Sequence, residues 1–440
     1  MRKKTKTAKK YLLLSMISVG IAGTLGAQTQ QEPLLLTLDK ALEIAISENP
    51  TIKIAEKEIE KQQYAKKEAW GNLLPTVGLI GQYERNFKIP IYAIGEMTVK
   101  MGRNNTYNGG IQASLPLSLG LLKAAQLSET GIELALESAQ ESKIKLKNEV
   151  EKAFFLALLT QDVYAVLQKS MENAENNYRD AKSKYEQGVA AEYDKIRADV
   201  QVSNLRPNLI DAENNVKLAE FQLKLLMGMP VTENVQAAGS LVDYESEYQS
   251  FNALYSYTLT NNSSLKQLDI QQQLLNKQLA LQRTSYYPSL SLSWNYLYRS
   301  MNDDFKFKDY QWSPASTLGL SVNVPIFSGF TRKNKELQIK SSIESLTLQR
   351  DYVEDGLDLQ IKAALLSMQK AIEQLESNKA TINAAEKAYS ISQARYKSGM
   401  GTLLELNDTE MAMRQAKLNY NQSIYNFISA KSDYNLLIGK

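Results

Sequence analysis

The chain has 440 residues, of which 43% are hydrophobic and 22% charged, so it can bury a substantial apolar core. It contains neither Cys nor His. This excludes thiolate or imidazole catalysis, ordinary zinc and copper sites, the usual haem ligands and disulfides. We therefore predict a protein that is not an enzyme and that uses no cofactor and no metal.

Residues 1–27 predict a cleaved secretory signal peptide, with six Lys and Arg in the first ten positions, a short apolar run from Tyr11 to Ile21, and Leu25-Gly26-Ala27 before the cleavage point. A membrane anchor would need about 20 apolar residues in a helix, and no later segment approaches that length. Removing six of the 51 basic residues leaves 45 against 48 acidic residues, a net charge of −3. The nominal +3 therefore gives no reason to expect nucleic acid as a partner.

The rest of the sequence is duplicated, with one copy at 28–228, a connecting segment at 229–250 and a second copy at 251–440. Asn49 and Asn262 are 213 residues apart, while Gly188 and Gly399 are 211 apart. In each copy the hydrophobic periodicity predicts a helix, a pair of strands, a very long helix and a returning helix.

The strand pairs are predicted at 76–87 with 107–117 and at 289–299 with 316–327. Apolar residues alternate there with Ser, Asn, Gly and Gln, most clearly from Leu290 to Tyr298. Each segment has about the 9 to 11 residues that a tilted strand needs to cross a bilayer, and 88–106 and 300–315 would be the outer loops. A soluble sandwich would show the same alternation. Four strands cannot close a barrel and open edges are not tolerated in lipid, so membrane strands would require oligomerisation. Three chains would give twelve strands.

The very long helices are predicted at 120–187 and 331–398, where no Pro occurs. About 67 helical residues span roughly 100 Å. Apolar and small residues repeat along them with heptad spacing, as at Leu167, Met171 and Ala174, which predicts coiled-coil partners. Pro207 predicts a kink near residue 203 of the first returning helix. The expected fold is mainly α with membrane β: a long α-helical coiled-coil barrel plus a trimeric 12-strand transmembrane β-barrel with four strands per chain.

These residues together resemble the TolC-like outer membrane efflux protein family over essentially the whole mature chain. The resemblance rests on the order and duplication of short motifs: Asn49-Pro50, Leu74-Pro75, Tyr287-Pro288, Val324-Pro325-Ile326-Phe327-Ser328-Gly329, and the glycine-marked hairpins at Gly188 and Gly399. The first copy departs from the family pattern at Leu115–Gly120. The resemblance implies a homotrimer in the outer membrane of a Gram-negative bacterium that extends into the periplasm. It would be a passive exit duct that docks with a periplasmic adaptor and an inner-membrane pump.

Two sites follow from the resemblance. The hairpin tips correspond to the family's adaptor-docking tips, at Gly188, Val189, Ala190, Ala191, Gly399, Met400, Gly401, Thr402 and the adjoining Leu403. Acidic rings of the periplasmic gate correspond to Asp194, Glu405 and Asp408. Three copies would turn each acid into a ring that concentrates cations in a narrow pore. The alternative is that these acids only stabilise a solvated first helical turn.

Three further residues near the tips bear on closure. Tyr185 and Tyr396 fit either hydrogen bonds that hold the closed state or simple heptad packing. Gly401 stands where the family commonly places a basic latch residue, which argues against a salt bridge from that position.

The expected function is an outer membrane exit duct of a tripartite efflux or type I secretion system, gated at the periplasmic helix tips by adaptor docking. Two alternatives are a periplasmic adaptor, which usually has one hairpin and a lipoyl-like domain, and a structural coiled-coil protein. The duplicated hairpins and the alternating strands argue against both. Drug efflux, metal efflux and protein secretion remain open as the system served.

Overall fold

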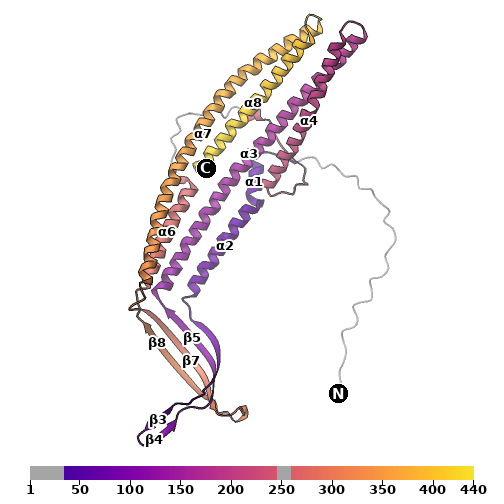
Figure 1. Ribbon diagram of the computed structural model, residues 1–440. Helices are drawn as coiled ribbons and strands as arrows, with labels where there is room; N and C mark the ends of the chain where they lie inside the picture. The colour runs from indigo at the N-terminus through magenta and orange to yellow at the C-terminus, as the bar shows by residue number, and fades with distance from the viewer. Residues whose placement is uncertain (1–33, 245–258) are drawn as a thin grey trace, which may run out of the picture.

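A computed structural model describes residues 34–244 and 259–440, so the predicted signal peptide at 1–27 lies outside the described residues. The protein is an elongated rod with helix hairpins at one end and a sheet at the other (Figure 1). None of the described helices is apolar over enough of its length to cross a membrane. The helices are α1 (Leu38–Glu48), α2 (Pro50–Gly71), α3 (Leu119–Glu186), α4 (Glu192–Leu226), α6 (Ser263–Thr284), α7 (Thr331–Lys397) and α8 (Leu403–Leu437), with short 3-10 turns η1 (Leu241–Tyr244), η2 (Leu259–Asn261) and η3 (Phe307–Asp309).

The main sheet is antiparallel and has the strand order β2-β5-β7-β8, so each copy contributes two adjacent strands. Its strands are β2 (Thr76–Arg85), β5 (Asn105–Leu117), β7 (Ser289–Asn302) and β8 (Ser313–Asn323). The register aligns apolar residues across one face, as in the row Ala113, Trp294 and Leu318. The opposite face carries polar rows such as Gln112, Asn295 and Thr317. Cross-strand partners share a face, so the sheet has one apolar and one polar side.

Several strand ends differ from the sequence-based expectation. β8 ends at Asn323 and not at residue 327, because Pro325 has no N–H to donate to the ladder. β2 ends at Arg85 and not at 87, since its last partner is Asn105, the first residue of β5. β7 continues to 302 because its strand pairs with β5 to that point. The segment 88–106, predicted as an outer loop, contains a hairpin of β3 (Ile91–Ile94) and β4 (Met97–Lys100).

The long helices pair as two hairpins, α3 with α4 and α7 with α8, which lie alongside each other through α3 and α8 (Figure 1). The two very long helices have 68 and 67 residues, and the returning helices have 35 each. Predicted heptad residues of α3 are buried in the seams, including Leu167, Met171 and Ala174. α4 continues as one helix across Pro207. Pro207 and Ser203 lie on the exposed side, where water can satisfy the carbonyl that the missing N–H leaves free.

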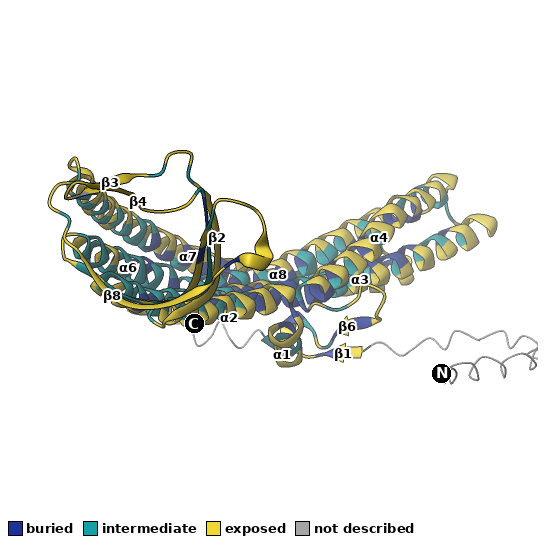
Figure 2. Cartoon of the chain, turned by 90° about the horizontal axis from the view of Figure 1, so that it is seen from below, coloured by how far each residue is buried: buried dark blue, intermediate teal, exposed yellow. Residues whose placement is uncertain are grey.

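The largest buried cluster lies midway along the helices and contains Phe154, Phe155, Leu158, Ile424 and Phe427. A short parallel pair, β1 (Leu34–Leu36) with β6 (Val235–Ala237), packs against it together with α1 and η1. Buried residues gather between the helices, whereas the sheet is largely exposed (Figure 2). The core of one chain is therefore helical, and the sheet contributes little to it.

A pair of equivalent joints fixes the middle of both copies. Asn49 accepts the N–H of Thr51 at the start of α2 and donates to the carbonyl of Leu226 at the end of α4, with an N–O distance of 2.7 Å. Asn262 does the same in the second copy, accepting from Leu265 N and donating to Leu437 O at 2.8 Å. Each buried amide thus satisfies groups at two helix ends that have no partner within their own helices.

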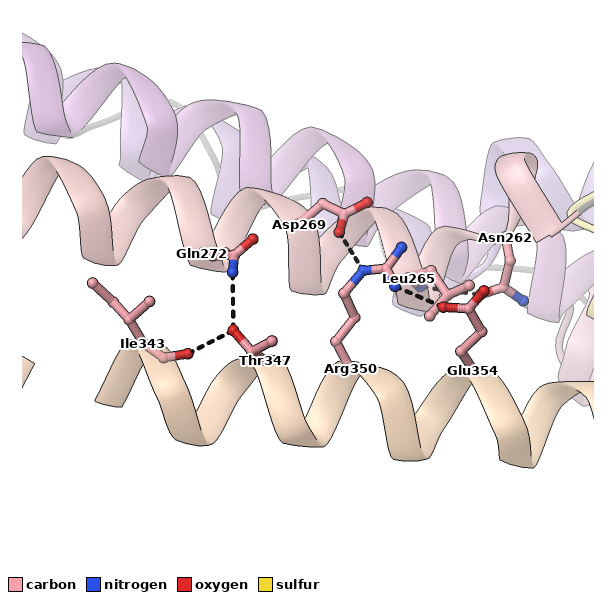
Figure 3. Close-up of polar contacts among 8 residues, drawn as sticks. All are labelled: Asn262, Leu265, Asp269, Gln272, Ile343, Thr347, Arg350 and Glu354. Atoms are coloured by element: carbon pink, nitrogen blue, oxygen red, sulfur yellow. Dashed lines mark hydrogen bonds and ion pairs between the residues drawn. The ribbon is translucent and has the colours of Figure 1, made fainter. Parts of the chain in front are cut away.

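Next to the second joint, α6 is tied to α7 by charged and polar side chains (Figure 3). The guanidinium of Arg350 contacts Asp269 at 2.7 Å and Glu354 at 2.6 Å. The amide of Gln272 donates to the hydroxyl of Thr347 at 3.1 Å. These contacts hold the shorter helix along the outer half of α7.

Candidate functional site at the helix tips

The first hairpin reverses direction at Gly188, which has φ +75°. Its N–H bonds the carbonyl of Tyr185 at 2.9 Å, and the N–H of Val189 bonds the carbonyl of Lys184 at 2.9 Å. This is the Schellman arrangement, in which a left-handed residue ends the helix; glycine adopts it without steric cost. α4 then begins after Ala191, which has no side chain able to cap the helix.

The second hairpin repeats the same reversal at Gly399, with φ +76°. A side-chain cap distinguishes it, because the hydroxyl of Thr402 accepts the N–H of Glu405 at 3.1 Å. Gly401 packs so closely on the end of α7 that an added Cβ would lie 3.0 Å from the Cβ of Arg395. The turn geometry therefore favours glycine at 401, where the family pattern has a basic residue.

The predicted docking residues 188–191 and 399–402 form the turns at the extreme ends of both hairpins (Figure 1), whereas the adjoining Leu403 is buried. Val189 and Met400 are the large apolar side chains of the two turns, and both are exposed. Each turn thus presents one apolar side chain at the end of a rigid helix pair.

The two tips pack on each other through Tyr396. Its ring lies in a cluster with Ala181 of α3, Ala198 of α4, and Leu403 and Leu406 of α8. The ammonium of Lys184 is 4.0 Å from the ring centroid, a distance at which cation–π attraction is effective. Tyr396 is therefore a packing residue between the hairpins.

The predicted gate residue Asp194 belongs to the same contact. Burial raises the pKa of the Tyr396 phenol, and the nearby carboxylates of Asp180 and Asp194 raise the pKa further. Asp194 itself is half-buried in the first turn of α4. Tyr185, by contrast, is partly exposed and is approached by Lys195 of its own hairpin, 5.1 Å from the ring centroid.

Glu405 and Asp408 are exposed on the first turns of α8. Glu405 has a basic partner that the sequence pattern did not suggest. The guanidinium of Arg395 is 3.9 Å from the Glu405 carboxylate and 3.3 Å from the carbonyl oxygen of Met400. Arg395 precedes Glu405 by ten residues, and only the reversal at Gly399 brings the two side chains together. The second tip thus has a cation despite the glycine at 401.

Deeper in the second hairpin, Glu410 and Arg414 form an ion pair with an N–O distance of 3.2 Å. Their side chains are only 5% and 14% exposed, and one carboxylate oxygen of Glu410 has no hydrogen-bond partner. The positions 211 residues earlier, Asp199 and Ser203, are exposed. The buried charge pair is therefore particular to the second copy, and sequence reasoning missed it.

No group of three or more Asp or Glu side chains within residues 34–244 and 259–440 is arranged to hold a metal ion. Two long helix hairpins that continue into an open antiparallel sheet with one apolar and one polar face define the architecture of this class of protein. The comparisons with known proteins identify its family.

The chain belongs to the outer membrane efflux protein family, whose model matches residues 41–229 and 254–439. Outer membrane protein TolC of Escherichia coli (strain K12) is 20% identical over 432 residues, covering 95% of this chain and 84% of the relative. Nodulation protein T of Rhizobium leguminosarum bv. trifolii is 20% identical over 357 residues, covering 78% of this chain and 74% of the relative. The predicted family, outer membrane location and efflux function are confirmed at this level.

Solved structures show the same fold. The CmeC outer membrane channel of Campylobacter jejuni superposes with a TM-score of 0.73 at 17% identity, covering 96% of this chain and 94% of that chain. VceC of Vibrio cholerae gives a TM-score of 0.72 at 13% identity, covering 91% of this chain and 96% of that chain. The family consists of outer membrane channel proteins and not of enzymes.

Proposed function

We propose that the chain is one protomer of a homotrimeric exit duct, in which three four-stranded sheets close a 12-strand barrel in the outer membrane. The observation that carries this proposal is the open two-faced sheet. β2 and β8 have no neighbour on their outer edges among the described residues, and open strand edges are not viable in lipid. Pairing β8 of one copy with β2 of the next removes all edges at once.

Exposed apolar stripes on the outermost helices support the same assembly. α7 exposes Leu348, Tyr352, Leu359 and Leu366, spaced by four and seven residues along one face. On the opposite flank of the chain, α4 exposes Leu218 and Leu225, and α2 exposes Ile54 and Tyr64. Exposed apolar residues that share one face of a helix favour packing of that face against a partner. A ring of three copies brings the two flanks together as a helical tunnel of about 100 Å, from the rise of the 68-residue helix.

The gate of this duct is proposed at the tips, where Asp194, Glu405 and Asp408 become three-membered acidic rings. Rings of carboxylates attract cations and repel anions in a narrow pore. Tyr396 holds the second hairpin against the first, so an adaptor that docks at Val189 and Met400 and separates the hairpins would open the pore. The docking residues are proposed from their exposure and position, and the gate residues from their position at the start of α4 and α8.

The partners are proposed to be a periplasmic adaptor and an inner-membrane pump of an efflux or type I secretion system. The names of two relatives refer to different cargoes: the cobalt-zinc-cadmium resistance protein CzcC of Cupriavidus metallidurans and the pyoverdine export outer membrane protein OpmQ of Pseudomonas aeruginosa. The adaptor that co-purifies with this chain from its own membrane would identify the system.

Assembly and gating can be tested on the purified protein. We expect an SDS-resistant trimer that dissociates on heating, and small conductance in planar bilayers with block by divalent cations. Replacing all three acids, Asp194→Asn with Glu405→Gln and Asp408→Asn, should weaken cation block. The control Asp211→Asn, which removes an exposed acid on α4 farther from the tip, should leave cation block unchanged. A monomer in detergent would refute the duct, and unchanged block in the triple variant would refute the gate.

A further inference from the structure

A basic and aromatic collar surrounds the level at which the strands meet the helices. It comprises residues 66–75, 118–124, 283–288 and 324–336, which contain seven Lys and Arg but only two acidic residues. This local excess of five positive charges is larger than the +3 of the whole chain. The outer end of the sheet differs, because its loops at 86–104 and 303–312 hold five basic and four acidic residues. The positive charge is therefore concentrated at one end of the sheet.

The collar also exposes large apolar side chains. They include the aromatic residues Trp70, Tyr286, Tyr287, Phe327 and Phe330 and the aliphatic residues Leu74 and Ile326. Phe330 has φ +61° and is the only non-glycine residue in the described ranges with a left-handed backbone, a conformation that bulky residues rarely adopt. This strained turn carries the ring of Phe330 outward beside that of Phe327, with centroids 5.5 Å apart.

Arg332 holds two turns of the collar together. Its guanidinium lies 3.3 Å from the carbonyls of Ser285 and Pro325, and 5.5 Å from the centroid of the Tyr286 ring. Lys333 and Lys335, also at the start of α7, are exposed. Arg332 thus positions the aromatic turns, while the two lysines remain available for a ligand outside the chain.

Aromatic residues at the end of a membrane segment occupy the headgroup level of a bilayer. Basic clusters beside a membrane segment attract anionic lipid headgroups, with about a fivefold gain in binding per Lys or Arg close to the surface. We propose that the collar binds the headgroups of anionic phospholipids in the periplasmic leaflet and fixes the depth of the barrel in the membrane. This inference rests on the proposed function, because it requires the sheet to lie in a bilayer.

Three tryptophans allow a direct test, since the chain has only Trp70 in the collar, Trp294 on the apolar face of the sheet and Trp312 near its outer end. Double Trp→Phe variants that retain one tryptophan each are reconstituted in phosphatidylcholine vesicles containing brominated phosphatidylglycerol or brominated phosphatidylcholine. Bromine quenches tryptophan only at contact range. Trp70 should be quenched more strongly by the anionic lipid, with the preference lost at about 1 M salt, where the Debye length is about 3 Å. Trp294 should be quenched equally by both lipids.

Charge variants made in the Trp70-only chain identify the binding groups. Lys333→Gln with Lys335→Gln should reduce the preference for phosphatidylglycerol by at least about fivefold, the contribution of one lysine at an anionic surface. The control Lys370→Gln with Lys387→Gln makes the same charge change on exposed positions of the same helix, far from the sheet, and should leave the preference unchanged.

The outcomes separate the inference from the proposed function. If Trp294 is quenched but Trp70 shows no lipid preference, the collar does not bind anionic lipid, although the barrel is in the membrane. If Trp294 is quenched and Trp70 is reached by neither lipid, a second copy of the chain covers the collar, and the inference is wrong. If Trp294 itself is not quenched, the sheet is not in the bilayer and the duct proposal fails.

Discussion

The buried ion pair of the second hairpin gives the sharpest prediction about stability. Removing the carboxylate by Glu410→Ala leaves the Arg414 guanidinium buried without its partner. Breaking a buried pair costs about 3–5 kcal/mol, and we expect about 3 kcal/mol because 14% of the Arg414 side chain still contacts water. Replacing both residues with Met removes both desolvated charges, so the double variant should be unchanged or more stable by up to about 2 kcal/mol.

The pair of Glu213 and Lys217 on α4 is a matched control, because it has the same i,i+4 spacing and order with side chains 51% and 55% exposed. Glu213→Ala should cost only about 0.3–0.5 kcal/mol. In thermal unfolding followed by far-UV circular dichroism, the melting temperature should fall by a few degrees for Glu410→Ala and hardly at all for the control. Equal losses of stability in the two single variants would contradict a special role for burial of the pair. So would a melting temperature of the double Met variant as low as that of Glu410→Ala.

Three further variants test the sheet, a joint and the tip. Gly110→Ala should prevent normal pairing of β5 with β7, because the added Cβ would lie 2.7 Å from the Cα of Leu297. The control Gly109→Ala places its Cβ in open space, so the sheet of this variant should resist protease as well as the parent does, and that of Gly110→Ala should not. Asn262→Ala should lower the free energy of unfolding by about 1–3 kcal/mol, measured by thermal unfolding, since it leaves a half-buried helix-end carbonyl unpaired. Arg395→Gln should strengthen cation block in planar bilayers, because Glu405 loses its nearest cation; unchanged block would contradict this.

Repeating local patterns made much of the fold predictable. The heptads of α3 and the alternation from Leu290 to Tyr298 are each set by which face must be apolar, and that information is present in every few residues. The ends of the strands were harder to predict from sequence, because they depend on which strand each one pairs with. β2 stops at Arg85 since its partner β5 begins at Asn105, a fact that lies in another part of the chain. The β3–β4 hairpin was not predicted, because polar and apolar residues are mixed over residues 91–100 without the regular alternation that marks a strand.

The tip residues could be placed from sequence, but their contacts could not. Gly188 and Gly399 mark helix ends because a left-handed residue is needed there. Arg395 reaches Glu405 only after the chain reverses, and the spacing of ten residues matches no helical period. The burial of Glu410 depends on the packing of α8 against neighbouring helices, so its own sequence context, which resembles a solvated i,i+4 pair, gave no signal.

The two copies are alike at the joints that fix the fold and differ at the helix tips, where we propose that an adaptor docks. Gly228 and Gly439 both have positive φ, and a Cβ on either would lie under 3.0 Å from the carbonyl oxygen before the asparagine of its own joint. A substitution there would be resisted twice, by backbone conformation and by the close approach, which explains why both glycines persist. The residues that begin the returning helices are not constrained in this way, since Ala191 leaves α4 uncapped and Thr402 caps α8. Since the joints fix the base of each hairpin, differences at the far ends can alter docking and opening without disturbing the fold that carries them.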